Sequence, residues 1–283
     1  MQIKTAISLL AVGLLLSFAT QAEVSSPTGP LPKWELGAGV AGLSLPDYPG
    51  ADQSSSYVLP FPYIIYRGER IKANRDGLRG LLIEHRRWDL DISVGGSLPV
   101  NSSDNDARAG MESLDFSFEL GPSLRFKFYD TPSQNLQLRF NLRALLAVDG
   151  FPAFNYEGWL FNPELRWRQH LTDSLTWGAS LQMRYGSDDY HQYFYGVANR
   201  FATASRPAYQ AEEGYNSSGF GLNLRWLANA DWRLNVAAAY IDLHDASFNG
   251  SPLFKQNNGV YFGLSVSRIL WRASTRVGAD PSD

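Results

Sequence analysis

Acidic and histidine side chains at short spacing are the first candidates for chemistry in this chain. Asp89-Leu90-Asp91 carries two carboxylates, and Asp189-Tyr190-His191 carries a carboxylate beside an imidazole. Such groups could share a hydrolytic acid–base reaction only if the fold brought the two segments together. The elements that hold these segments therefore decide whether they form a site.

Three other chemical motifs lack the surroundings that their function needs. Gly37-Ala38-Gly39-Val40-Ala41-Gly42 has the spacing of a dinucleotide fingerprint, but Leu43-Ser44-Leu45-Pro46 follows it and cannot continue as the required helix. Asp104-Asn105-Asp106 has oxygen ligands at calcium-like spacing without the rest of an EF-hand loop. A barrel phospholipase would need a serine close to a histidine on one strand, and none of the four histidines has a serine two residues further on. The chain also contains no cysteine. We therefore expect no catalytic residue, no cofactor site and no metal site.

In many segments of the chain, apolar and polar residues alternate with a period of two, which is typical of strands. The clearest segment is 114–128, where every second residue is large and apolar and the others are small, polar or charged. Similar segments are 34–43, 57–66, 70–83, 88–94, 136–142, 159–167, 177–185, 220–226, 232–240 and 260–266. Breaking 70–83 near Asp76-Gly77 into two short strands gives twelve strands. An even number places both chain ends on the same side of a barrel.

Strand faces and connections favour a membrane barrel over a soluble sandwich, which also alternates. The apolar faces are large and nearly uncharged, whereas the polar faces mix small residues with Arg, Glu and Asn. Short connections such as 67–69, 85–87 and 228–231 contrast with long ones such as 45–55, 99–112 and 187–217. We therefore predict a transmembrane antiparallel β-barrel with short periplasmic turns and long extracellular loops. In this fold the two acidic motifs lie at opposite ends, and a shared site is not expected.

The start of the chain predicts export. Lys4 precedes the apolar run Ala6 to Phe18, and Ala19-Thr20-Gln21-Ala22 resembles a cleavage site, which is the arrangement of a secretory signal peptide. We expect residues 1–22 to be this signal peptide, 23–33 a periplasmic lead-in, 34–271 the barrel and 272–283 a polar tail. The protein would lie in the outer membrane of a Gram-negative cell, surrounded by lipid. The net charge of -3 argues against a nucleic-acid partner.

The charged residues on the inward faces of the strands are the strongest candidates for a functional role in this barrel. The predicted inward cations are Arg125, Lys127, Arg139, Arg143, Arg166, Arg168, Arg184, Arg225 and Arg233. The predicted inward acids are Glu35, Asp89, Asp91, Asp115, Glu119 and Glu164. Opposite charges on neighbouring strands could pair and fill the lumen as a structural plug. Alternatively, the excess of arginine would give a pore a preference for anions.

Two loops carry a family resemblance. The first long loop contains Leu45-Pro46-Asp47-Tyr48-Pro49-Gly50-Ala51-Asp52, and the longest loop contains Asp188-Asp189-Tyr190 followed by Phe194 and Gly196. These segments resemble the MipA/OmpV family, the MltA-interacting outer-membrane proteins of Gram-negative bacteria, and the likeness spans essentially the whole mature chain. The chain departs from the usual barrel pattern at its end, because Trp271 is followed by Arg272 to Asp283 instead of closing the chain.

The resemblance implies a barrel without enzymatic activity. The founding member of the family acts as a scaffold that links a lytic transglycosylase, which is a murein hydrolase, to a bifunctional murein synthase. We therefore expect a scaffold or interaction protein for peptidoglycan-remodelling enzymes. The alternative is a small outer-membrane channel for small solutes with an Arg-rich lumen, and a weaker third possibility is a barrel hydrolase.

Overall fold

A computed structural model describes residues 30–68, 71–74, 77–131, 133–148 and 153–278 of the chain. The predicted signal peptide, residues 1–22, lies outside this described part. Of the predicted lead-in, the structure describes residues 30–33.

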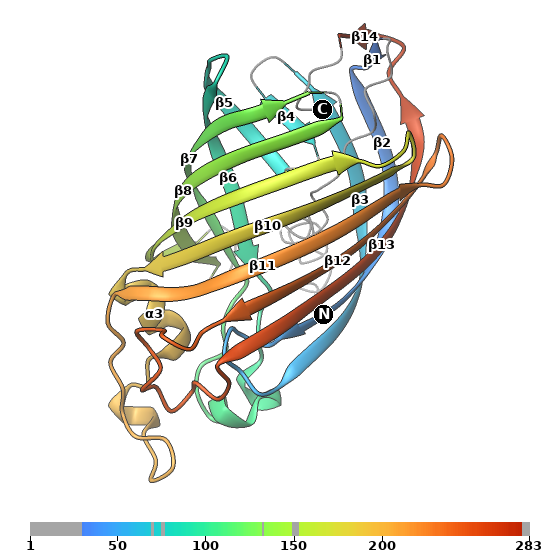
Figure 1. The fold of residues 1–283 in the computed structure, drawn as a ribbon. Helices are drawn as coiled ribbons and strands as arrows, with labels where there is room; N and C mark the ends of the chain where they lie inside the picture. The colour runs from blue at the N-terminus through green and yellow to red at the C-terminus, as the bar shows by residue number, and fades with distance from the viewer. Residues whose placement is uncertain (1–29, 69–70, 75–76, 132, 149–152, 279–283) are drawn as a thin grey trace.

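The described strands from β2 to β13 form one closed antiparallel barrel (Figure 1). Neighbours along the chain pair with each other, and β13 pairs with β2 to close the ring. The predicted all-β barrel is therefore confirmed. The strands are β2 (Trp34–Pro46), β3 (Ser54–Arg67), β4 (Ile71–Asn74), β5 (Gly77–Glu84), β6 (Trp88–Ser97), β7 (Ser117–Asp130), β8 (Gln134–Val148), β9 (Phe154–His170), β10 (Leu175–Gly186), β11 (Gly214–Leu227), β12 (Trp232–Asp242) and β13 (Asn258–Arg272).

Alternation along the strands separates an apolar outer wall from a polar interior. On β11, Leu222 and Leu224 are exposed on the outer face, whereas Arg225 is only 2% exposed. On β12, Val236 and Tyr240 face outward while Arg233 is buried. The inside-out pattern, with apolar residues exposed and charged residues buried, is the one that a lipid-facing barrel requires.

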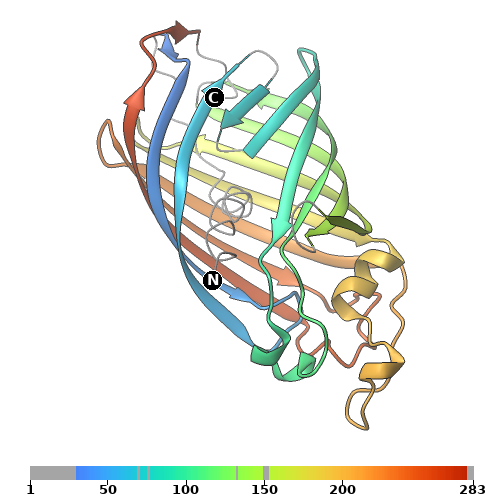
Figure 2. The same ribbon diagram turned by 180° about the vertical axis from the view of Figure 1, so that it is seen from behind.

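Connections of different length lie at the two ends of the barrel (Figures 1 and 2). The first and last described strands, β1 (Leu31–Pro32) and β14 (Arg276–Val277), pair with each other at the rim that carries short turns. The long loops at the opposite rim hold short helices. These are η1 (Ser102–Asp104), η2 (Asp106–Arg108), α3 (Asp188–Tyr195) and η3 (Asn199–Phe201). Within the described ranges, no helix is long and apolar enough to cross a membrane.

The start of the predicted strand 114–128 is wrong. β7 begins at Ser117, and Leu114 instead forms an isolated bridge with Val100 inside the loop that connects β6 to β7. Asp115, predicted to point into the lumen, is exposed in that loop. The alternation continues through 114–116, but Leu114 is buried by loop side chains instead of facing lipid.

The helix α3 was not predicted, since no helical stripe stands out in the sequence. Ser187 caps its first turn by accepting a hydrogen bond from Tyr190 N over 3.2 Å, and Asp188 and Asp189 lie in that turn. These residues suit a helix N-terminus, because they satisfy free backbone N–H groups and complement the helix dipole. Gly196 occupies the C-cap and donates its N–H to the Gln192 carbonyl over 2.9 Å.

Candidate functional site: the lumen and its outer cap

Glu119 is the centre of a charged cluster in the outer half of the lumen. Its Oε2 lies 3.4 Å from Arg143 Nη1, and its Oε1 lies 3.1 Å from Arg184 Nη2. Tyr190 of α3 donates its hydroxyl to Glu119 Oε1 over 3.3 Å. Arg143 also donates from Nε to Ser93 Oγ over 2.9 Å. The cluster therefore joins β6, β7, β8 and β10 to the longest loop.

A second group of charges lies nearer the rim of short turns. Arg125 forms ion pairs with Asp89 and Asp91, and Lys127 Nζ lies 2.9 Å from Asp89 Oδ2. Both carboxylates of the Asp89-Leu90-Asp91 motif are thus committed to buried ion pairs. Their counterparts, Asp189 and His191, lie in α3 at the other end of the barrel. The structure does not bring these two motifs together.

The remaining predicted lumen residues lie on β2, β8, β9, β11 and β12. Glu35 of β2 forms an ion pair with Arg67 over 3.0 Å, and Arg233 is buried on β12. Arg166 Nε is 2.6 Å from Glu164 Oε1, and Arg139 stands opposite Glu164 in the register of β8 and β9. Arg168 lies further along β9. Arg225 is buried on β11, opposite Thr176 of β10. Charged side chains therefore occur along much of the inner wall, and they do not gather at one point.

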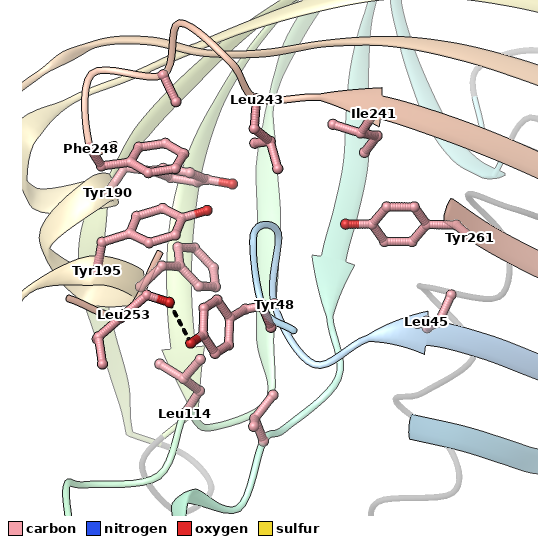
Figure 3. Close-up of a cluster of buried hydrophobic side chains, with 14 of the residues drawn as sticks. Leu45, Tyr48, Leu114, Tyr190, Tyr195, Ile241, Leu243, Phe248, Leu253 and Tyr261 are labelled. Carbon is pink, nitrogen blue, oxygen red and sulfur yellow. Dashed lines mark hydrogen bonds between the residues drawn. The ribbon is translucent and has the colours of Figure 1, made fainter. Parts of the chain in front are cut away.

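Above the lumen, long loops meet in an apolar core that we call the outer cap (Figure 3). Tyr195 and Phe248 stack with ring centroids 3.6 Å apart, and Tyr48 donates its hydroxyl to the Leu253 carbonyl over 2.8 Å. Strand residues such as Ile241 and Tyr261 point toward the same region (Figure 3). The outer cap consists of Tyr48, Leu114, Tyr190, Phe194, Tyr195, Leu243, Phe248 and Leu253.

The family-like residues of the first long loop have structural roles at this cap. Asp47 accepts hydrogen bonds from Ser55 Oγ over 2.6 Å and from Asn105 Nδ2 over 2.8 Å. Gly50 has a φ of 87°, and a Cβ there would lie 2.5 Å from the ring of Phe254. Only glycine fits this turn without strain and a clash.

The family-like residues of the longest loop lie partly on its surface and partly in the outer cap. Asp188 and Asp189 are exposed, whereas Tyr190 and Phe194 are buried. Burial raises the pKa of the Tyr190 hydroxyl, which therefore stays protonated and able to donate.

Arg108 and His191 are buried polar residues beside the cap. Sequence reasoning did not single out Arg108, and it considered His191 only as a possible acid–base partner of Asp189. Arg108 is 3% exposed and donates from Nη1 to the Phe194 carbonyl over 3.0 Å. His191 Nδ1 lies 2.7 Å from the Glu212 carbonyl oxygen, and burial lowers the pKa of the imidazole. No spacing motif marks Arg108, because its partner Phe194 is distant in the chain.

A cavity of about 280 Å³ lies between the cap and the ion pairs of the lumen. Tyr48, Tyr190 and Phe194 line it on the cap side, and Arg125, Arg139 and Glu164 line it deeper in the barrel. Its wall combines aromatic rings with both signs of charge. Such a space suits a small molecule that has a polar group and an apolar part.

Known proteins resemble this chain in sequence and in fold. Outer membrane protein Omp26La of Vibrio anguillarum is 31% identical over 83 residues, which cover 29% of this chain and 32% of that protein. The chain thus matches about a third of that relative's length.

Solved outer-membrane barrels are only broadly similar. The NanC porin has a TM-score of 0.42 at 10% identity, covering 82% of this chain and all of that chain. An outer membrane channel from Pseudomonas putida F1 has a TM-score of 0.48 at 10% identity, covering 86% of this chain and 98% of that chain.

The most extensive match is to a family. The model of the family described as MltA-interacting protein MipA matches residues 38–270, which include the strands from β3 to β12 and most of β2 and β13. The protein is an outer-membrane β-barrel with short periplasmic turns and long extracellular loops. This follows from the family match, the inside-out polarity of the barrel and the outer-membrane relative. The chain belongs to the MipA family.

Proposed function

We propose that the protein is a non-enzymatic outer-membrane scaffold whose periplasmic rim binds a peptidoglycan-remodelling enzyme. The observation that carries the proposal is membership of a family described by its interaction with MltA, a murein hydrolase. A scaffold needs no reactive group, and the acidic pair Asp89 and Asp91 is occupied by ion pairs with Arg125 and Lys127. The periplasmic rim is the part of the barrel that faces the cell wall.

The turn at residues 85–87 is a suitable contact on that rim. His85 donates its N–H to the Trp88 carbonyl over 2.9 Å, and the two rings stack at 5.4 Å. The Lys127 N–H donates to the Arg87 carbonyl over 2.9 Å. The backbone is thus fixed, while the side chains of Arg86 and Arg87 are exposed. A fixed turn with two exposed guanidinium groups suits an acidic surface on a partner.

The paired strands β1 and β14 offer a second periplasmic surface. Lys33 N donates to the Thr275 carbonyl over 2.9 Å, and Arg67 Nη1 donates to the Pro32 carbonyl over 2.8 Å. The strands β1 and β14 pair only with each other in the described chain. On β1 the Pro32 carbonyl is already bonded to Arg67 and proline has no N–H, so β14 is the strand to which a partner strand could add. Two separate surfaces would allow a murein hydrolase and a murein synthase to bind at once.

Pull-down from a cell envelope tests the proposal. Tagged protein should retain a murein hydrolase, and the variant R86E/R87E should lose most of it, because two attractive charges become repulsive. The control R200E reverses an exposed arginine of the outer loops and should retain the enzyme. Retention by R86E/R87E at the level of the unaltered protein would contradict this contact surface.

A small-solute channel is the second candidate, and the lumen cavity with its arginine residues favours it. A planar-bilayer recording distinguishes the two functions. Steady conductance that shifts on substitution of Arg139 or Arg143 would support a pore. The outer cap packs aromatic side chains at the extracellular mouth of the barrel, and the scaffold proposal expects no steady conductance.

A further inference from the structure

The barrel wall is incomplete between β3 and β6. β3 pairs with β4 only through Tyr66↔Ala73 and Arg67↔Lys72, whereas it pairs with β2 along its whole length. Only residues 68–87 connect β3 to β6. A complete hairpin at about 10 residues per span would use all of them before any turn was made. The chain is therefore too short to continue the wall, and the β4–β5 hairpin fills only its periplasmic part (Figure 2).

The backbone of β3 is adapted to this edge. Arg67 directs its N–H toward the β2 side, where it donates to the Lys33 carbonyl. Since backbone groups alternate sides along a strand, the even-numbered residues direct theirs toward β6. Pro60 and Pro62 are among them, and proline has no N–H to leave unpaired, which is why it occurs on edge strands. Two costly donors are thus absent from an edge that faces the membrane.

This gap, which we call the window, has four defined borders. β3 and β6 form its sides, and the β4–β5 hairpin forms its periplasmic end (Figure 2). Contacts between loops close the outer end: Asn105 Nδ2 donates to Asp47 Oδ2 over 2.8 Å, and Asp106 N donates to Gln53 Oε1 over 2.6 Å. The window therefore lies in the outer half of the wall, where it faces the outer leaflet.

Behind the window lies the lumen cavity, which touches both bordering strands. Tyr57 of β3 and Ser97 of β6 line it. The inward face of β3 is largely apolar there, with Tyr57, Leu59 and Phe61 packed against the buried core. The outer face is apolar too, and Val58 is 76% exposed. Apolar side chains thus lie on both faces of β3 at the window, and Tyr57 among them lines the cavity.

The charged cluster at the end of this path has a net positive charge, because Arg143 and Arg184 share the single carboxylate of Glu119. Gly95 of β6 lets the cluster approach the window: a Cβ there would lie 3.1 Å from Arg143 Nη1. The side chain of Arg143 keeps 15% of its area accessible. An anionic group in the cavity could therefore reach this guanidinium.

We propose that the window is a lateral portal for an amphiphile with an anionic head and one apolar tail, which enters from the outer leaflet. The head binds at Arg143, and the tail lies along Tyr57, Leu59 and Phe61. Charge complementarity and the opening toward lipid select this class of ligand. The inference does not rest on the murein role of the periplasmic rim, since the two surfaces lie at different places on the barrel.

Cysteine labelling tests the portal, and the absence of native cysteine gives no background. Leu59 and Ala239 are both partly buried against the same core, but only Leu59 borders the window. Pyrene maleimide dissolved in the bilayer should label L59C about tenfold faster than A239C. A water-soluble maleimide should show no such preference. If the ratio of the L59C labelling rate to the A239C labelling rate is the same with both reagents, the portal is overturned.

Photo-crosslinking tests the ligand. A diazirine-bearing dodecanoic acid, added to the protein in nanodiscs, should label Tyr57, Leu59 or Ser97 and be displaced by dodecanoate. The corresponding alcohol should label the same residues about tenfold less, because it lacks the charge that Arg143 binds. The variant R143Q should label like the alcohol, provided that its heat-modifiable gel mobility shows a folded barrel. Equal labelling of the window by acid and alcohol in the unaltered protein, or acid labelling confined to the outer wall, would overturn the anionic site.

Discussion

Tyr190 donates its hydroxyl to Glu119 across 3.3 Å, which connects the helix of the longest loop to the wall of the barrel. The same phenol oxygen also accepts from Arg184 Nη2 over 3.3 Å. Because Glu119 lies on β7 and Arg184 on β10, this contact links the position of α3 to the ion pairs inside the lumen. The outer cap and the lumen network are therefore one interacting structure.

Y190F should weaken this connection without leaving a cavity at position 190. The ring would still fill its place, but Glu119 and Arg184 would lose a buried partner, at a cost of about 1–2 kcal/mol. Urea unfolding in detergent, followed by heat-modifiable gel mobility, would measure the loss. The control Y240F changes a tyrosine on the lipid-facing wall and should have little effect. Equal unfolding midpoints for Y190F and the unaltered protein would contradict the connection.

F248A should damage the outer cap more severely. Phe248 is fully buried and stacks on Tyr195, so truncation leaves a cavity that costs about 3–5 kcal/mol. Protease sensitivity of the long loops in intact cells should rise together with a lower unfolding midpoint. V260A, which truncates an exposed side chain of β13, serves as the control. A protease-resistant F248A protein would show that the cap does not depend on this stacking.

R108M should separate the loop of η2 from α3. The Arg108 guanidinium donates to the carbonyls of Phe194 and Glu112 over 3.0 and 3.2 Å. A methionine of similar length would keep the packing but remove the donor to the Phe194 carbonyl, at about 1–3 kcal/mol. The Glu112 carbonyl would keep its hydrogen bond from Ser102 Oγ over 2.7 Å. Amide exchange in residues 100–110 and 190–196 should accelerate together. Faster exchange in only one of the two segments would argue against this link.

Acid should loosen the outer cap through His191. Burial lowers its pKa from 6.5, and Arg184 adds to this effect, while the hydrogen bond with the Glu212 carbonyl opposes it. Ser247 and Asn216 also face the ring. The unfolded chain binds a proton near pH 6.5 before the folded chain does. The stabilisation is therefore complete above that pH and is lost as the pH falls toward the lowered pKa.

The unfolding midpoint of the unaltered protein should accordingly fall between about pH 7.5 and about pH 5.5. H191N should show a smaller change over the same range, because asparagine does not titrate. An identical pH dependence in both proteins would assign the effect to another group.

The two faces of the wall could be predicted because they follow from local periodicity. Leu222 and Arg225 differ in polarity, and their positions along one strand place them on opposite sides. The division between short turns and long loops also follows from local sequence, as does the break that produces the short β4–β5 hairpin.

The outer cap could not be predicted, since its contacts join distant parts of the chain. Tyr48 bonds to Leu253 across 205 residues, and no local pattern encodes that pairing. Leu114 was placed on the lipid face because an apolar residue that alternates on a strand looks the same as one buried by loops. For α3, the signal was present in Ser187, Asp188 and Gly196, but its eight residues are too few for a clear helical period.

Binding between purified components tests the scaffold account most directly. The full chain in nanodiscs would be titrated with a purified murein hydrolase of the MltA type, using interferometry. The account predicts saturable binding that R86E/R87E weakens about tenfold or more, while R200E binds like the unaltered protein. Absence of binding by the unaltered barrel, or equal affinities for all three proteins, would contradict the account.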